Sequence, residues 1–164
     1  MKKIYIVLLI ILSSVSFTSC LKSGLEDNLP RYADAFMTDV FMEYRFEDPA
    51  ATSGGSPVVR IVNLPVSGKQ FKRKETTGSP VDSAVFTVTV PAASGTFTTA
   101  ERAKVSQGNL VFYCNISTAA TMQAASDAPL PGIPGDFNQP RTYTVTAADG
   151  TSRNWVVRIA SFVK

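Results

Sequence analysis

Apolar and polar residues alternate along several short segments of this chain, most clearly over residues 141–159. In residues 141–147 every second side chain is apolar and the others are mainly threonines, and residues 154–159 show a second apolar alternation that begins at Trp155. Because successive side chains of a strand point to opposite faces, each segment predicts a strand with one apolar face. Asp149-Gly150 between them is a turn signal, since glycine adopts a positive φ at little cost. The pattern therefore predicts a β-hairpin.

The spacing of these two segments constrains the loop between them. A two-residue loop at Asp149 and Gly150 would turn the two apolar faces to opposite sides of the sheet. A three-residue loop, residues 148–150, with Gly150 left-handed in a bulge, brings the two faces together. Tyr143 then lies opposite Trp155, an aromatic cross-strand pair that contributes about 0.2–1 kcal/mol.

The rest of the chain carries similar, shorter patterns. Residues 57–64 are apolar on both faces with a polar break at Arg60, which favours a central strand. Residues 47–56 contain Asp-Pro, Gly-Gly and Ser and predict a loop. Segment Thr98–Glu101 matches a capping box and predicts a short helical turn over residues 99–104. Strands are also predicted over residues 37–46, 84–90, 109–117 and, as a weak edge strand, 119–125.

Residues 127–140 contain four prolines, which remove backbone donors and exclude a helix or a regular ladder. We expect an extended loop that crosses from one sheet to the other, with Phe137 packed over the end of the domain. About seven short strands and one short helical turn predict an all-β, two-sheet β-sandwich over residues 35–164.

The amino terminus has the composition of an export signal. Lys2 and Lys3 precede the apolar residues 4–12, a run too short to span a membrane as a helix, and Ser/Thr-rich residues follow. The end of this segment, Phe17-Thr18-Ser19-Cys20, resembles a bacterial lipobox, although Phe17 stands where leucine is usual. The resemblance implies a signal peptide over residues 1–19 and a lipid on Cys20; the alternative is an ordinary secreted protein cut nearby.

Residues 20–34 are polar and are expected to be a tether between the lipid and the folded domain. The acidic pair Glu26-Asp27 resembles, at a later position, the acidic run that directs some Bacteroidetes lipoproteins to the cell surface. We therefore expect a protein of the outer membrane, on its periplasmic or its cell-surface face.

Composition removes several classes of function. The formal net charge is +3, of which Lys2 and Lys3 contribute two, so the remainder carries about +1 and does not suggest a nucleic-acid partner. The chain has no histidine, the commonest general base and transition-metal ligand. Cys114 lies in an apolar strand pattern and is expected to be an inert, buried thiol. No cofactor, metal site or catalytic residue is predicted, and we expect no enzyme, because the thirteen acidic residues are scattered.

One basic cluster lies in residues 65–80: Lys69, Lys72, Arg73 and Lys74 surround Phe71. It predicts either a patch for an anionic ligand or a membrane surface, or a solvated hairpin tip. The second interpretation is favoured because Glu75 and Asp82 dilute the positive charge.

Several segments resemble a known family. They are Asn115–Thr121, Gly135–Phe137, Tyr143–Thr151, Glu43–Arg45 and Val88–Pro91. The first three, in this order, and the last two, from the amino-terminal part, are similar to the immunoglobulin-like modules of gut Bacteroidetes outer-membrane lipoproteins, a family catalogued as a domain of unknown function. The resemblance implies an immunoglobulin-like sandwich and carries over no binding residue.

A tethered sandwich without site chemistry is expected to be a non-catalytic binding or accessory module at the cell surface. Glycan capture would need exposed aromatic platforms with polar neighbours, and the candidates are Phe41, Phe71 and Tyr113, whose alternative is edge packing. The other function considered is a structural, adhesive or envelope-assembly subunit that uses exposed sheet edges for strand addition. Expected partners are therefore the membrane, through Cys20, and a polysaccharide or an envelope protein.

Overall fold

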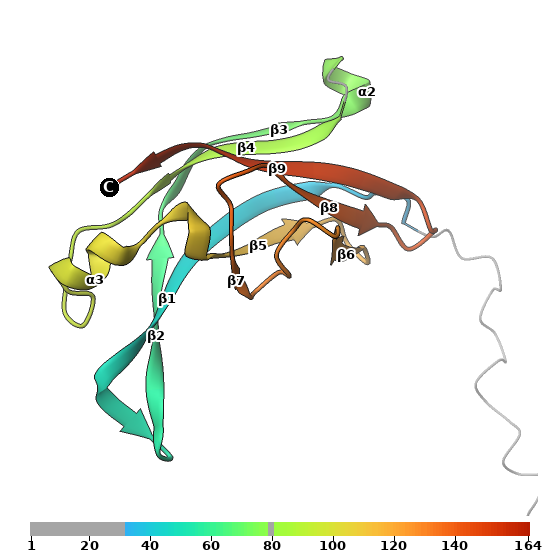
Figure 1. The fold of residues 1–164 in the computed structure, drawn as a ribbon. Coiled ribbons are helices and arrows are strands. Elements are labelled where there is room, and N and C mark those ends of the chain that lie inside the picture. The colour runs from blue at the N-terminus through green and yellow to red at the C-terminus, as the bar shows by residue number, and fades with distance from the viewer. Residues whose placement is uncertain (1–31, 79–80) are drawn as a thin grey trace, which may run out of the picture. The chain divides into compact units, whose positions relative to one another are not determined.

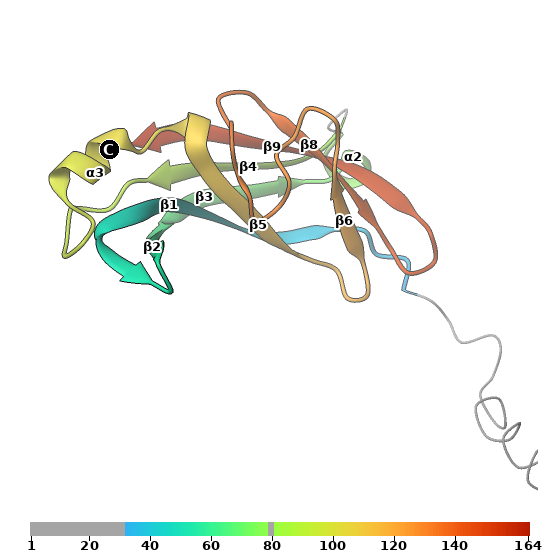
Figure 2. The same cartoon turned by 60° about the horizontal axis from the view of Figure 1, so that its bottom comes forward.

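The computed structural model describes residues 32–78 and 81–164, which form two stacked β-sheets (Figures 1 and 2). The predicted signal peptide, Cys20 and most of the predicted tether lie outside the described residues. The strands are β1 (Met37–Ser53), β2 (Ser56–Leu64), β3 (Val66–Lys72), β4 (Asp82–Thr89), β5 (Leu110–Ile116), β6 (Thr121–Ala124), β7 (Pro134–Gly135), β8 (Arg141–Thr146) and β9 (Ser152–Val163). The short helical turns are α2 (Lys74–Thr77), α3 (Thr99–Lys104) and the 3-10 turn η2 (Gln107–Asn109).

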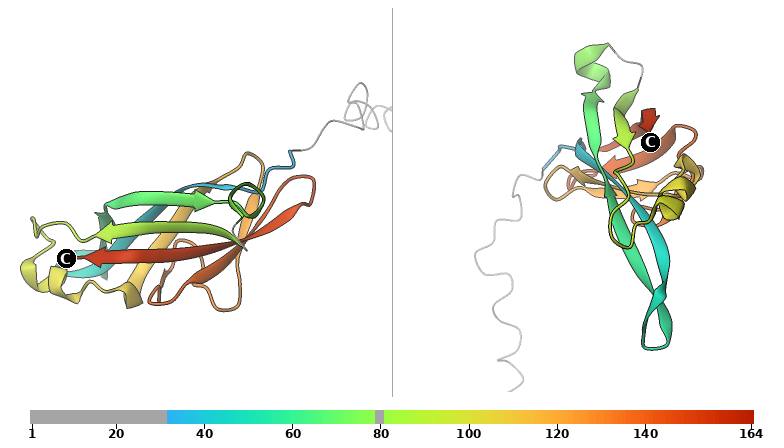
Figure 3. Two further views of the ribbon diagram at one scale, coloured as in Figure 1. Left: turned by 90° about the horizontal axis from the view of Figure 1, so that it is seen from above. Right: turned by 90° about the vertical axis from the view of Figure 1, so that its left-hand side faces the viewer.

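One sheet has the order β2-β1-β5-β7 and the other the order β3-β4-β9-β8-β6. Most neighbours are antiparallel, but β4 and β9 run in the same direction (Figure 3, left). The two-sheet β-sandwich is therefore confirmed, with nine strands where about seven were predicted.

The core lies between the inner faces of the two sheets. Trp155, at its centre, is fully buried, and its indole N–H donates to the carbonyl oxygen of Ala35 at 3.0 Å. Around it, Tyr143 and Phe112 pack ring to ring with centroids 4.9 Å apart. Burial raises the pKa of the Tyr143 phenol, whose hydroxyl donates to the carbonyl oxygen of Pro129 at 2.9 Å.

The carboxy-terminal hairpin is confirmed in strands, register and loop. Tyr143 lies opposite Trp155, and Gly150 has a φ of 94° in the three-residue loop. The amide of Ala147 donates to the oxygen of Thr151, and the amide of Gly150 donates back to Ala147. The parity of the two apolar faces therefore predicted the three-residue turn correctly.

Two predictions about residues 47–64 are wrong. Residues 47–53 continue β1, and only Gly54 and Gly55, both at positive φ, form the turn into β2. A register shift between Asp48 and Thr52 absorbs Pro49, whose missing amide would otherwise interrupt the ladder. The resulting β1–β2 hairpin extends beyond the sandwich (Figure 1; Figure 3, right). Accordingly β2 is an edge strand, although its sequence favoured a central one.

The predicted helical turn is confirmed. The hydroxyl of Thr98 accepts the amide of Glu101 at 3.2 Å, as expected of an N-cap, but the Glu101 carboxylate accepts from the Tyr44 hydroxyl at 2.7 Å. The proline-rich loop does not cross from one sheet to the other as predicted, because the strands it joins, β6 and β8, pair with each other in the five-stranded sheet. The proline-rich segment leaves β6, pairs briefly with β5 of the four-stranded sheet as β7, and returns to β8 in the five-stranded sheet where it began. Phe137 is buried against Phe112. None of the helices in the described part of the chain is long and apolar enough to cross a membrane.

Candidate functional site

Two of the three predicted binding aromatics lie side by side on the outer face of the four-stranded sheet. Phe41 in β1 and Tyr113 in β5 are direct cross-strand partners. Their ring centroids are 6.1 Å apart with an angle of 30° between the ring planes, and Phe41 is 37% exposed. They point outward because their neighbours Val40, Met42 and Phe112 point into the core. The two rings form a continuous aromatic surface, of which the Phe41 ring is the more exposed part.

This pair is the floor of a groove of about 270 Å³, which we call the aromatic groove. It forms where the pairing of β2 with β1 ends at Met42, so that β3 comes close to the amino-terminal half of β1. Its lining residues are Val40, Phe41, Met42, Asn63, Leu64, Pro65, Val66, Lys69 and Tyr113.

Lys69 provides the charge at this groove, together with Asp39. The Lys69 ammonium lies 2.6 Å from the Asp39 carboxylate and 5.2 Å from the centre of the Phe41 ring. The hydrogen bond from Lys69 lowers the pKa of Asp39 below its ordinary value. The two charges balance, so the groove combines an aromatic floor with a polar but electrically neutral rim.

Phe71, the third predicted binding aromatic, does not share this surface. Its half-buried ring packs edge-on against Trp155 with centroids 6.4 Å apart, so its predicted outward orientation is wrong. The cause is a register shift in β3 between Ser67 and Gln70, where Gly68 has a φ of 59°. One extra residue reverses the alternation and turns Phe71 toward the core.

The basic cluster of residues 65–80 is also dispersed. The favoured solvated hairpin tip is confirmed for the end of this segment, where the exposed turn α2 lies between the paired strands β3 and β4; residues 66–72 form β3 itself. Lys69 pairs with Asp39, and the Arg73 guanidinium lies 3.8 Å from the centre of the Phe36 ring. Lys69 and Arg73 thus contact different parts of the domain and do not act together as one anion-binding site.

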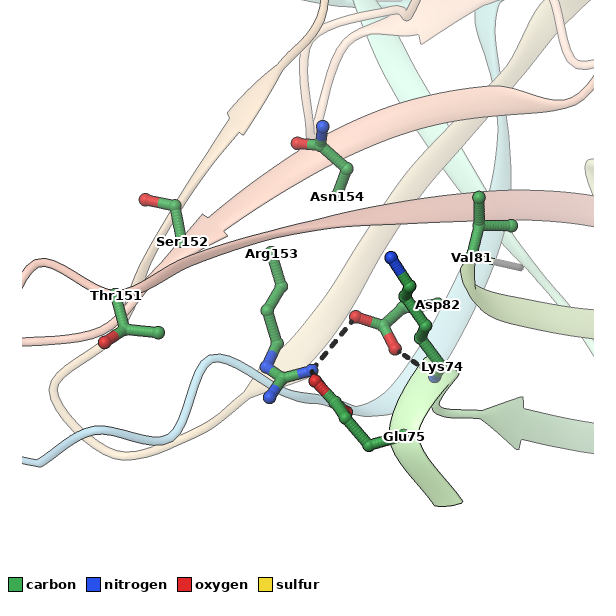
Figure 4. Close-up of a pocket in the computed structure, with 8 residues that line it drawn as sticks. All are labelled: Lys74, Glu75, Val81, Asp82, Thr151, Ser152, Arg153 and Asn154. Atoms are coloured by element: carbon green, nitrogen blue, oxygen red, sulfur yellow. Dashed lines mark hydrogen bonds and ion pairs between the residues drawn. The ribbon is translucent and has the colours of Figure 1, made fainter. Parts of the chain in front are cut away.

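A second, polar pocket of about 430 Å³ lies between α2, β4 and the start of β9 (Figure 4). Arg153 reaches across it to the carboxylates of Glu75 at 2.7 Å and Asp82 at 3.4 Å. Asp82 is buried and also accepts the backbone amide of Lys74 at 2.7 Å. The hydrogen bond from Arg153 lowers the pKa of Glu75. These contacts hold α2, β4 and β9 together, so the charges of Arg153, Glu75 and Asp82 stabilise the fold. The alternation of apolar and polar residues could not predict this ion-pair cluster.

Cys114 is half-buried in β5, with its thiol 3.4 Å from the Met122 sulfur. Burial raises the pKa of this thiol to about 12. Within residues 32–78 and 81–164, no group of three or more His, Cys, Asp or Glu side chains could hold a metal ion.

We expect native Cys114 to react with a thiol reagent at pH 8 about 1,000-fold more slowly than in the denatured chain, because only the thiolate reacts. The measurement is the labelling rate with and without urea, in a Cys20→Ser background. Equal rates in both conditions would contradict the expectation.

The fold and the aromatic groove define the class of protein. It is a two-sheet β-sandwich with an aromatic groove on one outer face. The chain belongs to the DUF5018-related family, whose profile matches residues 37–158. It is 35% identical to a crystallised Bacteroides fragilis protein whose description proposes that it is secreted. That match has a TM-score of 0.70 and covers 82% of this chain and all of the other. The predicted resemblance to a Bacteroidetes family of unknown function is thus confirmed.

A second similarity is to a Bacteroides thetaiotaomicron structure whose description proposes a glycoside hydrolase. It has 24% identity and a TM-score of 0.31, and covers 47% of this chain but only 18% of the other, so no argument rests on it. The comparison with curated proteins gives no match.

Proposed function

We propose that this protein is a non-catalytic carbohydrate-binding module, anchored at the outer membrane through a lipid on Cys20 and acting as an accessory in glycan capture. The observation that carries the proposal is the cross-strand pair of Phe41, which is exposed, and Tyr113, which is half-buried, on the outer face of the sheet. Aromatic rings are flat apolar surfaces that cost little conformational entropy to immobilise, and they suit the apolar face of a sugar ring.

The rim of the groove supplies the second requirement of this function. Asn63 is exposed and can donate and accept hydrogen bonds, and Lys69 and Asp39 hold each other in place. A sugar ring stacked on Phe41 would have polar groups within reach around its hydroxyls. Because the pair is electrically balanced, neutral glycans suit the groove better than polyanions.

Affinity electrophoresis tests this function. The protein is run through gels that contain single plant or host polysaccharides, and at least one neutral polymer is expected to retard it. We expect Phe41→Ala and Tyr113→Ala each to weaken binding at least about tenfold, equivalent to about 1.4 kcal/mol.

The matched control is Tyr32→Ala, since Tyr32 is 61% exposed but lies outside the groove. This variant is expected to be retarded like the unaltered protein. Migration unaffected by every polymer, or equal losses in the Tyr32 and Phe41 variants, would refute the assignment to the groove. Metabolic labelling with a fatty acid in the native host tests the anchor separately: a Cys20→Ser variant should lose the label.

A further inference from the structure

The two sheets have four edge strands, and three of them are protected against pairing with another strand. Edges are usually blunted by short length, proline, bulges or lysines. β7 has two residues, one of them Pro134, and β6 has four. β3 carries the bulge at Gly68 and two lysines, one of which reaches over to β1.

The fourth edge, β2, has none of these protections between its two flanking prolines. Residues 58–62 read Val-Val-Arg-Ile-Val, and Val59 and Ile61 are each 56% exposed on the same face of the strand. Arg60 points to the opposite face, where its guanidinium lies 2.9 Å from the buried Asp48 carboxylate. The β2 edge therefore presents the apolar side chains of Val59 and Ile61, and its one cation, Arg60, is already paired with Asp48.

This short sequence is complementary to itself. If two copies of β2 pair antiparallel about a twofold axis at Arg60, Val59 of each chain lies opposite Ile61 of the other, and Val58 lies opposite Val62. Both exposed apolar residues then gain a β-branched cross-strand partner. The two arginines at the axis are each balanced by their own Asp48. Shifting the centre to Ile61 would instead place Val59 opposite the polar Asn63.

We propose that the β2 edge is a homodimerisation surface, on which residues 58–62 of a second copy of this chain add as an antiparallel strand. The two four-stranded sheets would join into one sheet of eight strands around an isologous, self-complementary contact. Because β2 lies on the hairpin that extends beyond the sandwich, its free edge is accessible to the second copy (Figure 3, right).

Sedimentation of residues 31–164 from about 10 µM to about 1 mM tests the proposal, a range that suits a contact smaller than a standard interface. This unit is suitable because the crystallised Bacteroides fragilis relative, which is matched over its whole length, corresponds to 82% of this chain. We expect the average mass to rise from one chain to two. The Ile61→Lys variant should stay monomeric, whereas Leu130→Lys, at a 64% exposed loop position, should dimerise like the unaltered protein.

Cysteine cross-linking tests the register, and does not depend on the lysine variant folding. Val59→Cys chains and Ile61→Cys chains are oxidised separately and as a mixture, and only the mixture is expected to form a disulfide-linked dimer. A monomer at every concentration overturns the proposal, as does a dimer that Ile61→Lys leaves intact. Efficient cross-linking of Ile61→Cys alone overturns the register centred on Arg60.

Discussion

Replacing Trp155 with alanine is expected to lower the free energy of unfolding by about 3–5 kcal/mol, the range for removing a large aromatic side chain from a core. Trp155 is fully buried, packs against Phe71 and lies opposite Tyr143. Its removal also leaves the Ala35 carbonyl without the indole donor, an additional cost for a buried acceptor. Urea denaturation followed by circular dichroism measures the change.

The control for this experiment is Trp155→Phe, which keeps an aromatic ring in the core but cannot donate to Ala35. Its cost should be smaller, about 1–3 kcal/mol, since most of the apolar contact remains. A loss below about 1 kcal/mol for the alanine variant would show that the core does not depend on this residue.

The second large effect is expected at Gly135, in the short strand β7. A Cβ atom placed there would lie 2.3 Å from the Pro129 Cβ and 2.4 Å from its Cγ, far inside van der Waals contact. The proline ring is rigid, so Gly135→Ala must displace the loop and with it the Pro129 carbonyl that accepts the Tyr143 hydroxyl. We expect a loss of about 2–3 kcal/mol in the free energy of unfolding.

Gly108→Ala is the matched control, because Gly108 has no positive φ and an added Cβ would meet nothing closer than 3.4 Å. Its effect is expected to stay within about 0.5 kcal/mol. Similar losses in both variants would mean that the contact with Pro129 is not the cause.

Alternation and parity were sufficient to predict much of this fold. The strands begin near the predicted residues because a two-residue period is a local property of the sequence. The hairpin at residues 141–159 was predicted to its register, since a three-residue loop is the simplest one that brings Tyr143 and Trp155 to the same face. The loop character of residues 127–140 was predicted because four prolines remove backbone donors, although Pro134 still takes part in the short strand β7.

The wrong predictions concern properties that are not local. Whether β2 lies at an edge or at the centre depends on which strands pair, and residues 57–64 are apolar although they lie at an edge. The extension of β1 to Ser53 needs a bulge to absorb Pro49. A bulge of one residue also turned Phe71 inward, and periodicity cannot show such an insertion.

The candidate site could be predicted only in part for the same reason. Phe41 and Tyr113 were identified as outward-facing residues, because each lies in a strand with a clear alternation. That they are direct neighbours, with Lys69 above and Asp39 beside them, depends on the pairing of β1 with β5 and on the approach of β3. No sequence signal connects residues that lie 30 and 70 positions apart.

The place of the last strand governs when the domain can form. β9 lies in the middle of the five-stranded sheet, between β4, which precedes it by about 70 residues, and β8. Trp155, on this strand, also donates a hydrogen bond to the carbonyl oxygen of Ala35, which lies 120 residues earlier in the sequence. Because such distant contacts form late, the sandwich cannot close before the final dozen residues have been synthesised. We expect such a polypeptide to stay unfolded while it is translated, a state that suits the secretion proposed for its Bacteroides fragilis relative.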